Sequence, residues 1–290
     1  MTKKSLSAYF ELSKPRILTL VLVTTTIGYY LGAKGLVSPT PYPALLLGVA
    51  FTCAGSSALN HYLEREYDSK MERTRNRPIP SGVILPSHAL AFGVFLVLAG
   101  VAVLYTRVNM LSAFLGLLTA FLYILVYTPM KRISWLNTTV GAVPGGMPPL
   151  IGWAAATGTL CFDAGMLFLI LFIWQHPHFY AIGWMFRDDY KKAGFKMLPC
   201  LEPDGRMTFL QIQWFASALL PVSVIPALTG LSGNFYLIGA LLSGVMLLFV
   251  TNVFVRSQSN ADARKLLKAT VLYLPALLIF ILLDSRFNFQ

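Results

Sequence analysis

Long apolar stretches alternate with short charged segments along the whole chain. Nine stretches hold enough apolar residues for a helix to cross a bilayer core, which takes about 20. They cover residues 16–33, 43–62, 88–106, 110–127, 138–156, 164–183, 209–228, 235–254 and 267–284. These runs are too long for strands, and the alternating pattern of an outer-membrane barrel is absent. The pattern predicts an all-α integral membrane protein with nine transmembrane helices.

The composition strengthens this prediction. Hydrophobic residues make up 56% of the 290 residues and charged residues only 12%, whereas about a quarter of a soluble domain is charged. The loops between the stretches are short. We therefore expect one membrane domain over residues 1–290, without a second soluble domain.

Basic residues fall on alternate loops. Of 23 lysines and arginines, only Lys34, Arg107 and Arg286 lie in one set of loops, and the rest lie in the other set. Because basic loops stay inside, this split predicts a cytoplasmic N-terminus and a multi-pass protein of the cell membrane, the inner membrane in a Gram-negative source. The same rule explains the net charge of +11. The polar segments are too short for a nucleic-acid module, so no nucleic-acid partner is expected.

The second apolar stretch continues into a polar motif at its cytoplasmic end. Asn60, Glu64 and Asp68 recur every four residues, so on a helix they fan over only about 80°. Mg²⁺ binds one or two carboxylates and completes its shell with water and phosphate oxygens. Arg73 and Arg77 follow at once, and arginine pairs well with phosphate. The motif indicates an Mg²⁺–diphosphate site, although a solvated charged loop is the alternative.

Glycines and prolines interrupt the fifth stretch. The run 145–149 contains Gly145, Gly146, Pro148 and Pro149, which we expect to break the helix near its middle. Irregular backbone at membrane depth is tolerated where it lines a cavity. The alternative is a packing kink that binds no ligand.

Two histidines lie inside the sixth stretch. His176 and His178 flank Pro177, and ionisable residues inside a membrane are functional candidates by default. A neutral imidazole can ligate heme iron or act as a base. The alternative is a packed histidine without a chemical role. Asp188 and Asp189 follow at the end of this stretch, but no second acid stands four residues after either, so a second metal stays open.

The run from Asn60 to Asp68 resembles the first motif of the UbiA superfamily of intramembrane prenyltransferases, commonly NxxxDxxxD, with Glu64 where many members have Asp. The segments YTPMKR (127–132), the Gly/Pro run, PHF (177–179) and DYKKAGFKMLP (189–199) resemble the branch that farnesylates heme. This resemblance covers residues 10–285. It implies a nine-helix bundle around a central cavity, which binds an isoprenyl diphosphate through Mg²⁺.

The resemblance also implies a reaction. A farnesyl group moves from farnesyl diphosphate to a vinyl group of heme B, giving the hydroxyethylfarnesyl side chain of heme O. Heme B is then a substrate and Mg²⁺ the cofactor. The expected catalytic residues are Asn60, Glu64, Asp68 and His178. The expected metal ligands are Asn60, Glu64, Asp68, Asp188 and Asp189. The expected diphosphate contacts are Arg73, Arg77, Lys131, Arg132 and Lys192, and the expected heme contacts are Arg16, His176 and His178.

Two other functions stay open. A UbiA relative with a quinone-precursor acceptor would have a similar first motif. A secondary transporter also has broken helices and intramembrane ionisable residues, but its charged sites lie near the midplane, whereas these acids cluster at the cytoplasmic ends. A heme A synthase or the assembly of a terminal oxidase is a candidate partner that the residues do not decide.

Overall fold

The computed structural model describes residues 3–285, so Arg286 and both ends of the predicted domain 1–290 lie outside the described residues. The long helices are α2 (Pro15–Gly32), α3 (Pro41–Asp68), α4 (Pro86–Arg107), α5 (Met110–Phe121), α7 (Asn137–Thr157), α8 (Phe162–Met185), α11 (Arg206–Leu228), α12 (Asn234–Ser257) and α13 (Asn260–Leu283). The short ones are α1 (Lys3–Leu12), the π-helix η1 (Leu122–Tyr127), α6 (Thr128–Met130), α9 (Arg187–Lys192) and α10 (Leu198–Leu201). The predicted all-α fold is confirmed.

Seven helices are long and apolar enough to cross a membrane: α3, α4, the continuous unit Met110–Met130, α8, α11, α12 and α13. The other two predicted spans fall on α2 and α7, which do not reach this apolar character. Threonines at 24–26 dilute the apolar residues of α2, and glycines and prolines dilute those of α7. Seven of the nine predicted spans are therefore supported by length and composition.

The helix α7 is continuous, so the predicted break in the fifth span is wrong. Pro144, Pro148 and Pro149 lie inside an uninterrupted helix. Prolines are tolerated in membrane helices because neighbouring groups satisfy freed backbone atoms. Gln175 Nε2 on α8 donates a hydrogen bond to the Ala142 carbonyl oxygen on α7, which ties the two helices together. Gly141 and Gly145 leave space that the side chains of Tyr127 and Gln175 occupy.

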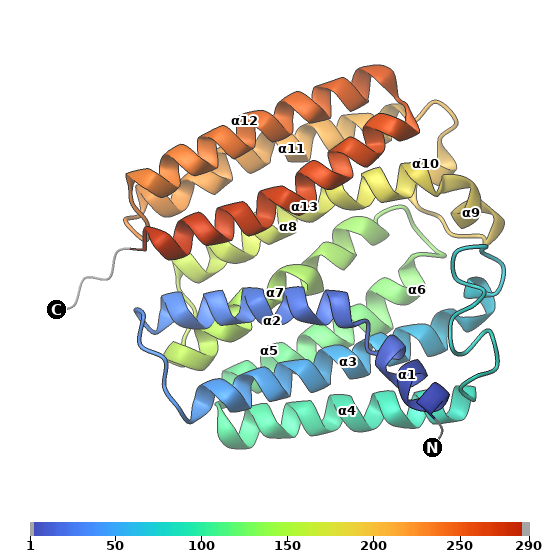
Figure 1. Cartoon of the computed structure of the whole chain (residues 1–290), viewed down its shortest axis with the longest axis horizontal. Coiled ribbons are helices and arrows are strands. Elements are labelled where there is room, and N and C mark those ends of the chain that lie inside the picture. The colour runs from blue at the N-terminus through green and yellow to red at the C-terminus, as the bar shows by residue number, and fades with distance from the viewer. Residues whose placement is uncertain (1–2, 286–290) are drawn as a thin grey trace.

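The long helices form two groups that lie side by side along the bundle (Figure 1). In one group α8, α11, α12 and α13 pack together around the largest apolar core, and in the other α2 packs on α7 and α3 on α4. The short helices α1, α6, α9 and α10 and the loop after α3 gather at one end of the bundle (Figure 1). That end carries the charged segments of the sequence.

Small residues let α2 and α7 approach each other closely. A Cβ atom added at Gly28 would overlap the backbone oxygen of Pro149, and one added at Gly152 would overlap that of Thr25. Membrane helices associate through such small-residue contacts because lipid supplies no hydrophobic drive between them. The contact keeps α2 against α7, where both helices line the cavity described below.

The close contact predicts that Gly152→Ala destabilises the protein. Because the methyl group would meet backbone rather than a movable side chain, α2 and α7 must separate, at a cost of about 1–3 kcal/mol. Thermal unfolding in detergent, followed by tryptophan fluorescence, measures the loss. Gly165→Ala on α8 is the matched control, since nothing lies within 4 Å of its added Cβ. Equal unfolding midpoints for both variants would contradict the packing argument.

Candidate active site

A cavity of about 350 Å³ lies among α2, α3, α5, η1, α7 and α8, within the usual range for small-molecule sites. Its end at the charged side of the bundle is polar, with Asn60, Glu64 and Asp68 from α3. Its inner part is apolar, with Val49 and Ile151 among the lining residues. The cavity can therefore hold an amphiphile with an anionic head and an apolar tail.

The α3 motif lies where the four-residue spacing predicts. Asn60, Glu64 and Asp68 share one helix and all line the cavity. Their exposed fractions are 1%, 6% and 0%. Buried charges require partners because desolvation is costly, so the contacts of these side chains define the site.

Each carboxylate is paired with a cation from a different segment. Lys131 follows α6 directly, and its Nζ lies 2.7 Å from Glu64 Oε1. Arg77 Nη1 donates to both carboxylate oxygens of Asp68 at 2.8 Å. The loop that returns Arg77 to the helix end is fixed locally, since Thr74 Oγ1 donates to the Asp68 carbonyl oxygen at 2.8 Å. Burial disfavours the Lys131 ammonium, but attraction to Glu64 outweighs it and raises the pKa of Lys131.

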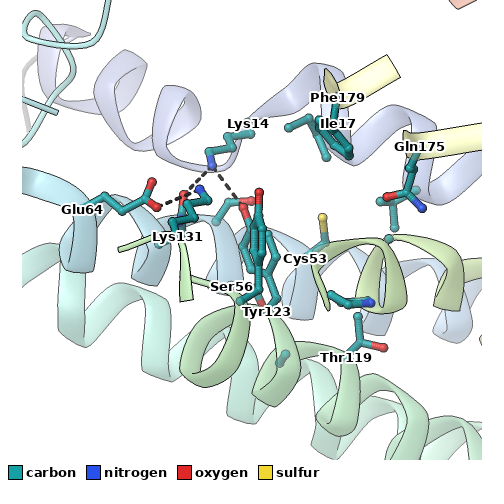
Figure 2. A pocket seen from close by; sticks show the side chains of 18 of the residues that line it. Lys14, Ile17, Cys53, Ser56, Glu64, Thr119, Tyr123, Lys131, Gln175 and Phe179 are labelled. Carbon is teal, nitrogen blue, oxygen red and sulfur yellow. Dashed lines mark hydrogen bonds and ion pairs between the residues drawn. The ribbon is translucent and has the colours of Figure 1, made fainter. Parts of the chain in front are cut away.

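Lys14 is the cation that contacts Asn60. Its Nζ donates to Asn60 Oδ1 at 2.7 Å and to the Tyr123 hydroxyl at 3.3 Å (Figure 2). Its backbone is left-handed, with φ 48° and ψ 64°, directly before Pro15 at the start of α2. Burial, together with repulsion from Arg77, lowers the pKa of Lys14 to about 7. The sequence offered only its place in a Lys-Pro-Arg triplet, and no role was predicted for it.

Two tyrosines on the π-helix η1 also line the cavity, and both were missed from the sequence. Tyr123 accepts the Lys14 hydrogen bond, and the Tyr127 ring centroid lies 4.6 Å from Lys131 Nζ. Gly141 on α7 leaves room for the Tyr127 ring, which an added Cβ would overlap. Single π-helical turns are frequent at functional sites. The two tyrosines are hard to recognise as site residues from the sequence, because tyrosines are common in membrane helices.

The charged helix α9 contacts the loop after α3 through the aromatic Tyr190 and not through its acids. Arg73, which lines the cavity, donates to the Tyr190 hydroxyl at 3.0 Å. Asp188 and Asp189 lie on α9 and neither lines the cavity. In the described part of the chain, no three or more His, Cys, Asp and Glu side chains are grouped as a metal would require. The structure therefore does not bring these aspartates to the predicted metal site.

Three predicted basic contacts also stay outside the cavity lining. Lys192 and Arg16 are exposed at the surface. Arg132 packs over the Tyr67 ring and donates to its hydroxyl at 3.0 Å. Of the predicted diphosphate contacts, the cavity contains Arg73, Arg77 and Lys131.

Neither predicted histidine lines the cavity; α8 presents Gln175 and Phe179 instead (Figure 2). His176 is completely buried, and both ring nitrogens have partners, the Phe172 carbonyl oxygen at 2.8 Å and Thr139 Oγ1 at 3.2 Å. The two histidines therefore lie on different sides of α8, and neither faces the cavity.

His178 points toward α13 and has one partnered nitrogen. Its Nδ1 lies 3.0 Å from Thr270 Oγ1, and its ring stacks on Trp174 with centroids 5.0 Å apart. The Thr270 hydroxyl donates its own hydrogen to the Leu267 carbonyl oxygen, so it must accept from His178 Nδ1–H. The hydrogen bonds thus leave the Nε2 lone pair free, and Nε2 is not among the buried unpartnered atoms of the described chain.

Comparisons with known proteins agree with this architecture. Residues 21–278 match the UbiA prenyltransferase family. A protoheme IX farnesyltransferase from Solibacter usitatus is 47% identical over 285 residues, which is 95% of this chain and 98% of that protein. Another protein of that name, from Koribacter versatilis, is 41% identical over 95% of this chain and 92% of its own length.

The chain belongs to the UbiA prenyltransferase family. Solved structures have the same fold. A digeranylgeranylglyceryl phosphate synthase matches with a TM-score of 0.82 at 18% identity, over 97% of this chain and 98% of its own. A UbiA homolog from Archaeoglobus fulgidus, bound to GPP and Mg²⁺, matches with a TM-score of 0.67 at 14% identity, over 94% of this chain and 99% of its own. As a UbiA-family member, the protein is a prenyltransferase and a multi-pass membrane protein.

The buried ion pair predicts a stability pattern. Lys131→Met leaves Glu64 buried without a counter-charge, which costs about 3–5 kcal/mol. The double variant Lys131→Met/Glu64→Gln has no uncompensated charge and should recover most of the loss. Thermal unfolding in detergent measures both. A double variant as unstable as Lys131→Met would mean that the lysine acts through packing and not through its charge.

Proposed function

We propose that this protein transfers the farnesyl group of farnesyl diphosphate to a vinyl group of heme B, which gives heme O. The observation that carries the proposal is the cavity with buried acids and cations at one end and an apolar interior. The relatives named protoheme IX farnesyltransferase supply the identity of donor and acceptor. A quinone-precursor acceptor is the alternative.

The donor set fits Mg²⁺. Asn60, Glu64 and Asp68 offer one amide and two carboxylates on one face of α3, and Mg²⁺ takes one or two carboxylates together with phosphate oxygens. The Mg²⁺ and GPP held by the Archaeoglobus fulgidus homolog support the same use of this fold. When bound, Mg²⁺ would neutralise charge that builds on the leaving diphosphate.

The cations of this chain would act on the same leaving group. Arg77 and Lys131 line the cavity beside the acids, where their N–H groups can donate to diphosphate oxygens. Such preorganised donors stabilise charge that develops as the allylic C–O bond breaks. The vinyl group attacks the farnesyl cation, and water adds to the resulting cation beside the porphyrin. The balanced products are hydroxyethylfarnesyl heme, diphosphate and one proton.

The inner cavity would hold the farnesyl chain away from water. Val49, Ile151 and Pro148 contribute apolar surface there. A dry site prevents early capture of the reactive cation by water.

His178 would ligate the heme iron on the side of α8 that faces α13, outside the cavity lining. Its neighbour Phe179 lines the cavity, and its free Nε2 with Nδ1–H held by Thr270 is the state that a metal-binding histidine needs. His176, whose nitrogens are both used, would be structural. Arg16 is exposed close to the cavity-lining Ile17 and could pair with a propionate.

The topology is part of this proposal. We infer one membrane domain with nine crossings, in which α2 and α7 cross inside the bundle; the buried Thr24 and Thr25 of α2 face protein and not lipid. The basic segments gathered at one end support a cytoplasmic N-terminus. Heme O would then pass to a heme A synthase or to terminal-oxidase assembly.

Product analysis tests the function, with Asp68→Asn as the inactive variant. Membranes containing the protein, incubated with hemin, farnesyl diphosphate and Mg²⁺, should form heme O, identified by mass. Asp68→Asn should nearly abolish it, because loss of one carboxylate weakens Mg²⁺ binding. Glu66→Gln is the matched control, since Glu66 is an exposed acid on the same helix. Prenylation of 4-hydroxybenzoate in place of hemin would refute the acceptor, and full activity of Asp68→Asn would refute the metal site.

The two histidines should separate in a heme titration. His178→Ala should shift the heme absorption spectrum and weaken heme binding, because it removes the iron ligand, while a non-hydrolysable farnesyl diphosphate analogue still binds. His176→Ala should leave the spectrum of bound heme unchanged and lower the thermal unfolding midpoint instead. An unchanged spectrum in His178→Ala would return this histidine to a packing role.

A further inference from the structure

The cavity lining contains four cations and two acids, and neither acid pairs with Lys14 or Arg73. Glu64 is paired with Lys131 and Asp68 with Arg77. Lys14 lies within the same lining, but its hydrogen-bond acceptors are the neutral Asn60 amide and the Tyr123 hydroxyl. Arg73 is exposed and donates to Tyr190, whereas Lys14 is half-buried beside Asn60. Lys14 is therefore the surplus positive charge beside the proposed metal site.

The backbone holds this surplus charge in place. A left-handed conformation is uncommon for a residue other than glycine, and Lys14 adopts it at the bend between α1 and α2. Such conformations persist where the surroundings fix them, and they gather at functional sites. The bend directs the Lys14 ammonium to Asn60 Oδ1, an oxygen that the proposed function assigns to Mg²⁺ (Figure 2).

We propose that Lys14 is a displaceable counter-cation, which occupies Asn60 Oδ1 in the empty site and moves onto the diphosphate when Mg²⁺ takes that oxygen. This inference rests on the proposed diphosphate site, but not on the identity of the acceptor. Lys14 is a substrate-binding residue in this scheme. It makes the binding of the metal depend on the binding of the diphosphate.

Charge balance explains the dependence. Mg²⁺ alone must displace an ammonium that then has no anion to pair with. A diphosphate alone brings negative charge beside Glu64 and Asp68. A prenyl diphosphate together with Mg²⁺ supplies both an anion for the displaced Lys14 side chain and a cation for Glu64 and Asp68. Because coupling between two ligands is reciprocal, each ligand should strengthen the binding of the other.

The test measures two affinities of the full chain in detergent. Mn²⁺ binding without diphosphate is followed by electron paramagnetic resonance. Binding of a radiolabelled, methylene-bridged farnesyl diphosphate analogue is measured with Mg²⁺ and with a chelator. Lys14→Met should bind Mn²⁺ more tightly and the analogue in Mg²⁺ about 10- to 150-fold more weakly, the range for losing one hydrogen bond to a charged group. A merely structural role would weaken both.

Lys34→Met is the matched control. Lys34 is an exposed lysine beyond the other end of α2, and its backbone is also left-handed, with φ 51°. It should change neither affinity. Lys14→Gln, which is neutral but retains a hydrogen-bond donor, should reproduce Lys14→Met and provides a second variant if the methionine impairs folding.

Three results would overturn the inference. The first is a fall of both affinities in a Lys14→Gln variant that unfolds at the wild-type temperature. The second is no change in either affinity. The third is an equal effect of Lys34→Met. Wild-type protein that binds neither ligand would overturn the diphosphate site itself, whereas failure to farnesylate heme with both ligands bound would overturn only the acceptor.

Discussion

Two carboxylates are buried at the charged end of the bundle, and the site is arranged around their neutralisation. Glu64 and Asp68 lie on α3 and are almost completely inaccessible. In such surroundings an unpaired ion costs several kcal/mol. Lys131 and Arg77 supply the counter-charges. Lys131 follows α6 and Arg77 lies in the loop after α3, so only the tertiary fold brings both to the same helix. The end of α6 and the loop after α3 are thereby fixed against one helix.

The same charges prepare the site for a ligand. An anionic head group can replace protein oxygens as the partner of these cations, while the carboxylates turn to a metal. The apolar part of the cavity continues from this polar end, along Val49 and Ile151. The proposed amphiphilic substrate would contact both parts, with its reactive bond at their border. This is the arrangement that charge development in a dry cavity requires.

The sequence predicted the parts that local spacing determines. Asn60, Glu64 and Asp68 recur every four residues, which is close to one helical turn. Any helix over this segment therefore places the three side chains on one face. Lys14 was missed because its contact with Asn60 depends on the bend before α2 and on the packing of two distant segments. The prolines of α7 were expected to break a helix that remains continuous, since propensity alone does not include the neighbours that satisfy its backbone.

Side-chain direction was the other limit. The sequence grouped His176 with His178, but positions two residues apart on a helix face different neighbours. Only the tertiary hydrogen bonds distinguish the buried histidine from the one with a free nitrogen. The family resemblance implied that Asp188 and Asp189 ligate metal, but they lie outside the cavity lining, and Tyr190 is the residue of α9 that contacts Arg73.

The central claim is that the Glu64 and Asp68 end of the cavity holds a metal–diphosphate head group. An experimental structure with Mn²⁺ and a non-hydrolysable farnesyl diphosphate analogue tests it most directly, because the anomalous signal of manganese locates the metal independently of the model of the ligand. We predict manganese within coordination distance of Glu64 and Asp68, with the diphosphate against Arg77 and Lys131 and the farnesyl chain toward Ile151. Manganese bound elsewhere, or a diphosphate that does not contact these cations, would contradict the account.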